Sequence, residues 1–212
     1  MNKKQSKVVK ILCFLLIFAC LQAVLVGCNQ PNEAEFLKTA EALLTEAELV
    51  NALCFGEGLA YDAENGYTSG GYCEATEESL SAFGVSSVTE IRARIRAVYS
   101  VVTAEWVESV ALSATYEDST VLSYSRYYDT VAAEESGNRP VLMVKKNYES
   151  LLSGRATYDN LRIVSLKRGR AEILVDVTVT KDGESRVEKD VSLSLRLEED
   201  GWRFDSPTYV SY

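Results

Sequence analysis

AEILVDVTVTKDGESRVEKDVSLSLRLEEDGWRFDSPTY, residues 171–209, alternates apolar and polar side chains in three consecutive segments. The segments cover residues 173–179, 191–197 and 202–204, and they are rich in β-branched, leucine and aromatic side chains. Alternation with a period of two predicts strands with one buried face. An Asp-Gly pair stands in each break, at 182–183 and 200–201, and Asp-Gly supplies the positive φ angles of tight hairpins. The stretch therefore predicts an antiparallel meander with one apolar and one polar face.

The first 27 residues have the pattern of an export signal. Four lysines come before an apolar run at 11–26, which is shorter than the about 20 residues of a membrane span and fits a secretory signal. The run ends in Leu25-Val26-Gly27-Cys28, which resembles the lipobox of bacterial lipoproteins. The resemblance implies cleavage before Cys28 and diacylglycerol on its sulfur. The alternatives are an ordinary signal peptide with a chance cysteine, or a retained single-span anchor.

These features predict a lipoprotein signal peptide at 1–27, a short tether at 28–32 and a single domain at 33–212. The expected location is the extracytoplasmic face of the cell membrane, with a lipid anchor that carries acyl chains such as palmitate. Removal of residues 1–27 takes away four of the 22 basic residues and none of the 31 acidic ones, which leaves a formal net charge of −13. Such a charge disfavours nucleic acid and anionic lipid surfaces as partners.

Two of the five cysteines lie in the signal segment, and Cys28 is the predicted lipidation site. Cys54 and Cys73 remain as a pair. Because export permits disulfides, we expect a Cys54–Cys73 bridge that clamps the loop between two helices. Two buried free thiols are the alternative.

The segment before the strands has helical periodicity. A helix is expected from near Pro31 until Gly56 and Gly58 stop it, followed by a loop at 61–71 and a short turn at 74–81. The tetrapeptide 87–90, Ser-Val-Thr-Glu, is a capping box in which Ser87 and Glu90 satisfy each other's backbone amides. It predicts a second helix, and Thr103 is expected to cap a third.

Further strands are expected at 121–129, 141–145 and 157–166, before the meander. Helices that precede a run of strands predict an α+β domain. The predicted fold has N-terminal helices packed on a curved antiparallel sheet of five to six strands, a cone-shaped roll.

Two segments carry a family resemblance: the tail Asp200-Gly201-Trp202-Arg203-Phe204-Asp205-Ser206-Pro207-Thr208-Tyr209 and the earlier segment 148–159, YESLLSGRATYD. With the order of helices before strands, the chain resembles the nuclear transport factor 2-like superfamily, also called cystatin-like. It looks like small exported lipoproteins of Gram-positive bacteria, of largely unassigned function. These motifs are structural, so they imply a fold rather than an activity.

The sequence offers little for acid–base or metal chemistry. There is no histidine, the commonest general base and metal ligand at neutral pH, so no Ser-His-Asp set is possible. No zinc-type cysteine spacing and no phosphate-binding glycine loop are present. We expect no cofactor, no metal and no enzymatic activity. In the resembled superfamily, isomerases use an Asp and a Tyr inside an apolar cone. The residues that could line such a cone here are Tyr124, Tyr127, Tyr128, Tyr158 and Asp129.

Two functional hypotheses follow. The first is a membrane-tethered, non-enzymatic binding or protein-interaction domain whose partner is another envelope protein. The second is a carrier, or an isomerase-like enzyme, that holds a small apolar ligand in the cone. The second requires a deep cavity into which Tyr and Asp side chains point.

Overall fold

The computed structural model describes residues 32–64, 66–132, 139–150, 155–181 and 184–208. Four helices are described, α2 (Glu33–Cys54), α3 (Glu77–Phe83), α4 (Val88–Val98) and α5 (Val101–Leu112). The strands of the first half are β1 (Thr68–Ser69), β2 (Tyr72–Glu74), β3 (Ala114–Glu117), β4 (Thr120–Tyr124), β5 (Tyr127–Val131) and β6 (Pro140–Lys145). The long strands are β7 (Arg155–Lys167), β8 (Arg170–Lys181) and β9 (Glu184–Glu198), and the short β10 (Gly201–Phe204) follows them.

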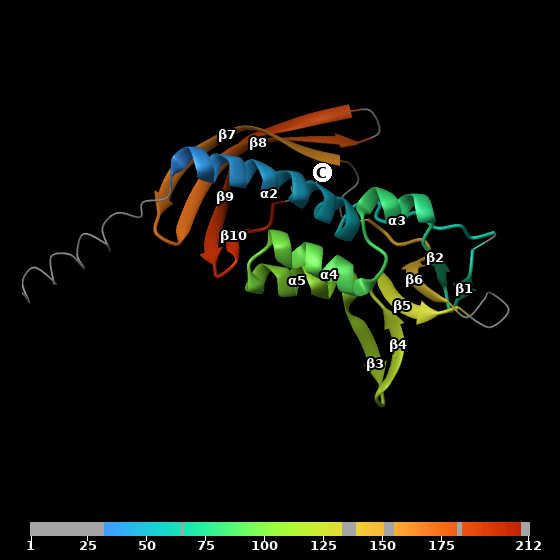
Figure 1. Cartoon of the computed structure of the whole chain (residues 1–212). Helices are drawn as coiled ribbons and strands as arrows, with labels where there is room; N and C mark the ends of the chain where they lie inside the picture. Colours follow the sequence, from blue (N-terminus) through green and yellow to red (C-terminus); the bar gives the residue numbers. More distant parts are fainter. Residues whose placement is uncertain (1–31, 65, 133–138, 151–154, 182–183, 209–212) are drawn as a thin grey trace, which may run out of the picture.

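The α+β class and the antiparallel pairing agree with the sequence prediction (Figure 1). The predicted single sheet of five to six strands is divided, however. The described strands form a large sheet in the order β10-β9-β8-β7, a small sheet in the order β1-β2-β6-β5, and a separate β3–β4 hairpin. The division arises because β6 pairs with β5 on one side and with β2 on the other. Strand β2 lies just after the segment predicted to be a loop and was not among the predicted strands.

The large sheet contains the predicted meander and bends over α2 (Figure 1). Ile173 pairs with Leu193 and Ala171 with Leu195, and all four side chains are buried. The register shifts between Asp159 and Arg162 on β7, and again at 175–177 on β8. Because β-bulges increase local twist and bend strands, these shifts account for the curvature.

Helix α2 lies along the inner face of this sheet. It begins at Glu33, where the Asn32 side chain accepts a hydrogen bond from the Ala34 amide at 3.0 Å. It ends at Cys54, before the glycines that were expected to stop it. Near its start, the rings of Phe36 and Trp202 pack edge to face with centroids 5.0 Å apart, which joins the helix to the last strand.

The capping box at the start of α4 forms only in part. The Ser87 side chain accepts from the Glu90 amide at 3.2 Å, as expected. The Glu90 carboxylate instead accepts from the Ser86 amide and hydroxyl at 2.5 and 2.8 Å, and these bonds lower the pKa of Glu90. Helix α5 begins at Val101 with Ser100 at its N-cap position, so Thr103 lies inside the helix and does not cap it.

The strand predicted at 121–129 is two strands. β4 ends at Tyr124 and belongs to the hairpin, whereas β5 begins at Tyr127 and belongs to the small sheet. Ser125 and Arg126 form the link between them. The prediction rested on the tyrosines at 124, 127 and 128, and a composition rich in strand-forming residues does not reveal where one strand ends and the next begins.

Candidate functional site

The five predicted pocket-lining residues occupy different environments and do not surround one pocket. Tyr127 and Tyr158 lie in the interior at separate places, Tyr124 and Tyr128 belong to a cluster on the small sheet, and Asp129 is exposed. Asp129 accepts from the Val88 amide through both carboxylate oxygens, at 2.9 and 3.1 Å. The carboxylate therefore satisfies a free amide at the start of α4, which is a structural role.

Tyr158 belongs to a buried hydrogen-bond network between α2 and the large sheet. The Asn51 amide donates to the Tyr158 hydroxyl at 3.0 Å and to Thr208 Oγ1 at 2.9 Å, and it accepts from the Tyr99 hydroxyl at 2.7 Å. The Tyr158 hydroxyl donates to the Thr208 carbonyl at 2.8 Å. Burial raises the pKa of Tyr158 to about 12 and also raises that of Tyr99. These neutral, mutually bonded groups fill the inner side of the curved sheet, where a ligand-binding cone would need space.

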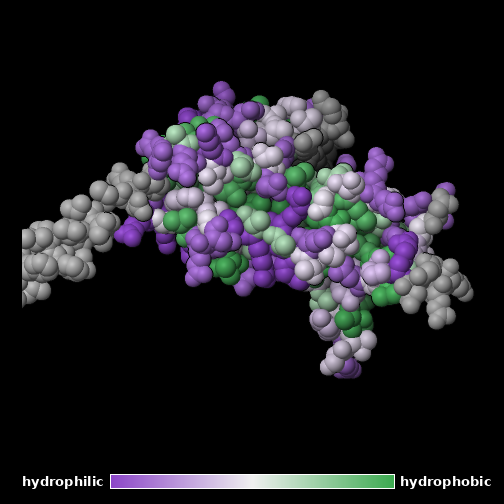
Figure 2. Space-filling model, viewed as in Figure 1, coloured by the Kyte–Doolittle hydropathy of each residue, from purple (hydrophilic) through white to green (hydrophobic). Residues whose placement is uncertain are grey.

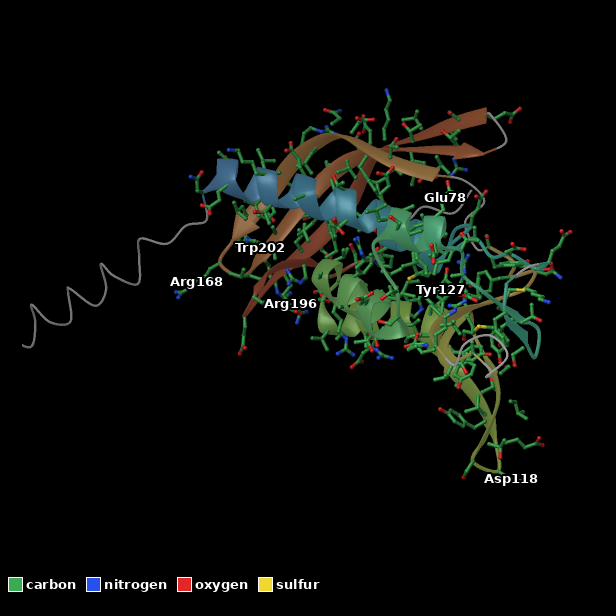
Figure 3. All side chains as sticks on the ribbon, turned by 45° about the vertical axis from the view of Figure 1, so that its right-hand side comes forward. Glu78, Asp118, Tyr127, Arg168, Arg196 and Trp202 are labelled. Atoms are coloured by element: carbon green, nitrogen blue, oxygen red, sulfur yellow. The ribbon has the colours of Figure 1, made fainter. Side chains whose placement is uncertain are left out.

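Tyr127 closes the other end of α2 (Figure 3). Its hydroxyl donates to the Leu53 carbonyl at 2.8 Å and accepts from the Leu59 amide at 3.1 Å. Burial raises the pKa of Tyr127, although the nearby Arg126 acts in the opposite direction. Both hydrogen-bonding functions of the phenol are engaged with the backbone, so Tyr127 holds the helix end rather than a ligand.

A cluster of tyrosines covers the face of the small sheet that lies away from the main core. The Tyr124 and Tyr128 rings stack with centroids 4.4 Å apart, and Tyr72 packs edge to face on Tyr128 at 4.9 Å. The Tyr72 hydroxyl donates to the Tyr124 carbonyl and accepts from its amide, at 2.7 and 2.9 Å. Tyr67 also packs here, over buried Val141 and Met143. We call Tyr67, Tyr72, Tyr124 and Tyr128 the tyrosine face.

The β3–β4 hairpin begins at the edge of the tyrosine face and projects from the body of the molecule (Figure 1), with Asp118 at its tip (Figure 3). Tyr116 is 63% exposed and Leu122 is 58% exposed. Val121, paired with Tyr116, is also exposed. Hydrophobic residues are visible along this projection in Figure 2. The two-stranded β3–β4 hairpin therefore exposes large apolar side chains to solvent.

Arg126 is a further functional candidate, and no pattern in the sequence indicates it. It lies in the link between β4 and β5, yet only 1% of it is exposed. Its Nη2 donates to the Glu57 carbonyl, whereas Nε and Nη1 have no hydrogen-bond partner among the described residues. A lone arginine between tyrosines in a strand pattern gave no signal of burial, because arginine is almost never fully buried unless it is paired.

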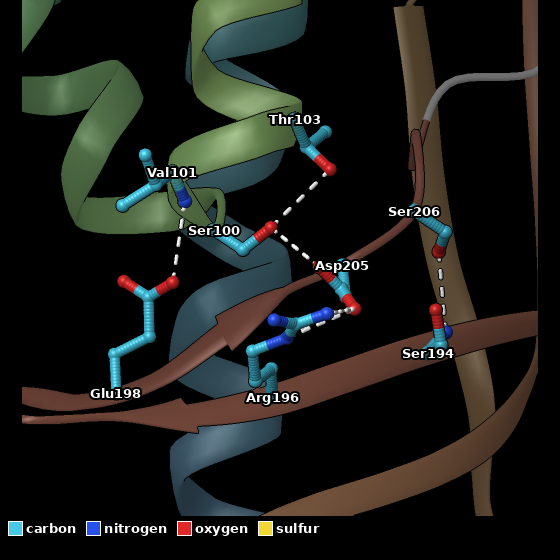
Figure 4. A network of polar contacts seen from close by, with 8 residues as sticks. All are labelled: Ser100, Val101, Thr103, Ser194, Arg196, Glu198, Asp205 and Ser206. Carbon is cyan, nitrogen blue, oxygen red and sulfur yellow. Dashed lines mark hydrogen bonds and ion pairs between the residues drawn. The ribbon is translucent and has the colours of Figure 1, made fainter.

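A polar network joins the start of α5 to the end of the large sheet (Figure 4). Asp205 accepts from the Ser100 hydroxyl at 2.6 Å and from Arg196 at 2.8 Å. Burial favours a higher pKa for Asp205, but these partners outweigh it and lower the pKa. Glu198 accepts from the Val101 amide at 3.2 Å. The network therefore joins the two elements through side chains from both.

A recess of about 240 Å³ lies beside this network. It is lined by Arg96, Tyr99, Val101, Glu105, Glu198 and Asp200. Ligand pockets for drug-sized molecules are roughly 300–1,000 Å³ and mostly apolar. The recess is smaller, and its lining is mixed in charge, so it does not meet the requirement of the carrier hypothesis.

Cys54 and Cys73 are both buried free thiols in the structure, which corresponds to the alternative and not to the expected bridge. Burial raises the pKa of Cys54 to about 12, so this thiol is neutral and unreactive at physiological pH. The predicted lipidation site, Cys28, lies outside the described residues. Within the described ranges, no group of three or more His, Cys, Asp or Glu residues is arranged to hold a metal ion.

None of the helices in the described part of the chain combines the length and apolar character that a membrane crossing requires. Comparison with protein families, with curated proteins and with solved structures found no match to this chain.

Proposed function

We propose that this chain is a lipid-anchored extracytoplasmic protein that binds a partner protein without catalysis. The binding surface is the β3–β4 hairpin together with the tyrosine face, which we call the distal face. The projecting hairpin carries the proposal: it exposes Tyr116 and Leu122, and no other described strand pairs with either of its edges. An isolated two-stranded hairpin is only marginally stable, so it gains from a partner that adds a strand and covers its apolar side chains.

The partner that suits this surface is an extended polypeptide segment with apolar side chains. Free strand edges offer main-chain hydrogen bonds, and the partly exposed rings of Tyr67, Tyr124 and Tyr128 offer amphipathic contact area over the buried Tyr72. The formal net charge of −13 expected for the mature chain opposes anionic lipid and nucleic acid as alternatives.

The position of the anchor supports the same surface. Helix α2 begins five residues after Cys28 in the sequence, and its 22 residues extend over roughly 33 Å. The hairpin lies toward the end of the molecule away from the start of α2 (Figure 1). A lipid on Cys28 would therefore leave the distal face directed away from the membrane.

We also propose a relationship to the nuclear transport factor 2-like superfamily, with α2 inside the curl of the large sheet. The order of the elements and the Trp-Arg-Phe final strand support it. The division into two sheets limits the comparison to α2, α4, α5 and the large sheet.

Site-specific photocrosslinking in the producing cells tests the binding surface. A photoreactive phenylalanine at Tyr116 or at Leu122 is expected to capture the same single protein, identified by mass spectrometry. The matched control is Val164 on β7, which is 52% exposed and should give no such adduct. Adducts of equal yield from all three positions, or none from the hairpin, would contradict the proposal.

Metabolic labelling with a palmitate analogue tests the anchor. The wild-type chain is expected to carry the label, Cys28→Ser should lose it, and Cys20→Ser should retain it, because residue 20 lies in the cleaved segment. Label that persists in Cys28→Ser would exclude Cys28 as the lipidation site.

A further inference from the structure

Arg126 is a buried cation that has no counter-charge among the residues the structure describes. The described residues within reach supply one acceptor, the Glu57 carbonyl at Nη2. No described Asp or Glu forms an ion pair with it, although nine such pairs occur elsewhere in the described chain. Because a guanidinium remains charged in proteins, Nε and Nη1 retain N–H donors for which the described part of the chain offers no acceptor.

Aromatic rings take the place of acids around this cation. The guanidinium carbon lies 4.2 Å from the centroid of the Tyr148 ring and 5.2 Å from that of Tyr127. Cation–π contact offsets part of the lost hydration, but it satisfies no N–H group. Cys54, the nearby thiol, is neutral and supplies no negative charge.

The backbone is shaped to admit the guanidinium. Gly58 has a φ of +70°, and a Cβ at this position would stand 2.1 Å from Arg126 Nη2. Only glycine combines this conformation with so close an approach. The space occupied by Arg126 is therefore a built feature of the fold, and buried donors without acceptors call for an explanation such as a bound ion.

We propose that Arg126 is a binding site for a small organic carboxylate. The ligand oxygens accept from the guanidinium N–H groups that the described residues leave unpaired, and the carboxylate supplies the counter-charge that these residues lack. A planar two-oxygen anion matches the fork of donors. A phosphate, with a second negative charge, would be left uncompensated by this one cation between aromatic rings.

Tyr148 is the side chain that the ligand must move. It is only partly buried, and it lies after β6 in a segment without helix or strand hydrogen bonding. Nε and Nη1 themselves have no contact with solvent. Rotation of the Tyr148 ring away from the guanidinium opens the site. The apparent affinity is therefore proportional to the fraction of molecules in which the ring does not cover Arg126.

The test is a titration of the full-length chain, purified in detergent, with sodium acetate against sodium chloride at matched ionic strength. The readout is the Arg126 Nε–H signal in a nitrogen–proton NMR spectrum, assigned by its absence in Arg126→Lys. We expect a saturable shift with acetate and none with chloride. Tyr148→Ala should lower the Kd several-fold. A Kd that is unchanged or higher would overturn the route past Tyr148.

Matched variants make the result decisive, with folding checked by circular dichroism and binding by acetate-induced thermal stabilisation. Arg126→Met should lose the stabilisation, and Arg168→Met, which changes an exposed turn residue, should retain it. If Arg126→Met does not fold, Arg126→Lys replaces it, because lysine keeps the charge without the fork. Three outcomes would each overturn the proposal. Acetate and chloride could give equal responses, or the stabilisation could survive in a folded Arg126 variant. The third is saturation by inorganic phosphate at a lower concentration than by acetate.

Discussion

The sharpest stability prediction concerns Asn51→Ala, at the centre of the network inside the curved sheet. Asn51 is 2% exposed and makes three hydrogen bonds, to Tyr99, Tyr158 and Thr208. At about 1 kcal/mol for each buried hydrogen bond, the substitution should lower the free energy of unfolding by about 3 kcal/mol. For a domain of this size, that corresponds to a melting temperature lower by roughly 6–12 °C.

Urea denaturation followed by circular dichroism measures this change, with Glu41→Ala as the control on the exposed side of α2. The control should stay within about 0.5 kcal/mol of wild type. Tyr158→Phe should cost about 2 kcal/mol, because two hydrogen bonds are lost. Since one bond is common to both substitutions, the double variant should cost about 1 kcal/mol less than their sum. An Asn51→Ala value equal to the control, or strict additivity, would refute the network as described.

Three further outcomes are expected. The pKa of Asp205 is lowered in the folded chain. Its contribution to stability is therefore present above the unfolded-state pKa of about 3.9 and is lost as the pH falls further. In urea titrations at pH 5 and pH 3, the free energy of unfolding should decline less for Asp205→Asn than for wild type. The raised pKa of Tyr158 gives the opposite pH dependence. Its contribution to stability is complete below the unfolded-state pKa of about 10 and declines as the pH rises through about 12. Between pH 9 and pH 11, the melting temperature should therefore fall less in Tyr158→Phe than in wild type. Cys54 and Cys73 should resist alkylation in the folded chain and both react in urea without reductant, and peptide mass spectrometry that finds neither modified would indicate a disulfide instead.

The small sheet could not be predicted from the sequence. Its strand β2 has three residues, too few to display a period, and its partner β6 lies about 70 positions later in the sequence. The tyrosine face could not be predicted for the same reason, because Tyr72 joins Tyr124 and Tyr128 only through this long-range pairing.

The sequence by itself determined the α+β class, the long first helix and the β8–β9–β10 meander, because these depend on local periodicity and on turn chemistry that neighbouring residues supply. It also supplied the export and lipidation hypotheses. Only the tertiary structure decided that Asn51 meets Tyr99, Tyr158 and Thr208 in the interior and that the strand at 121–129 breaks. It also decided that Arg126 is buried with no acid paired to it among the described residues. Those properties depend on contacts between side chains that are distant in the sequence, and the local alternation of apolar and polar residues does not specify such contacts.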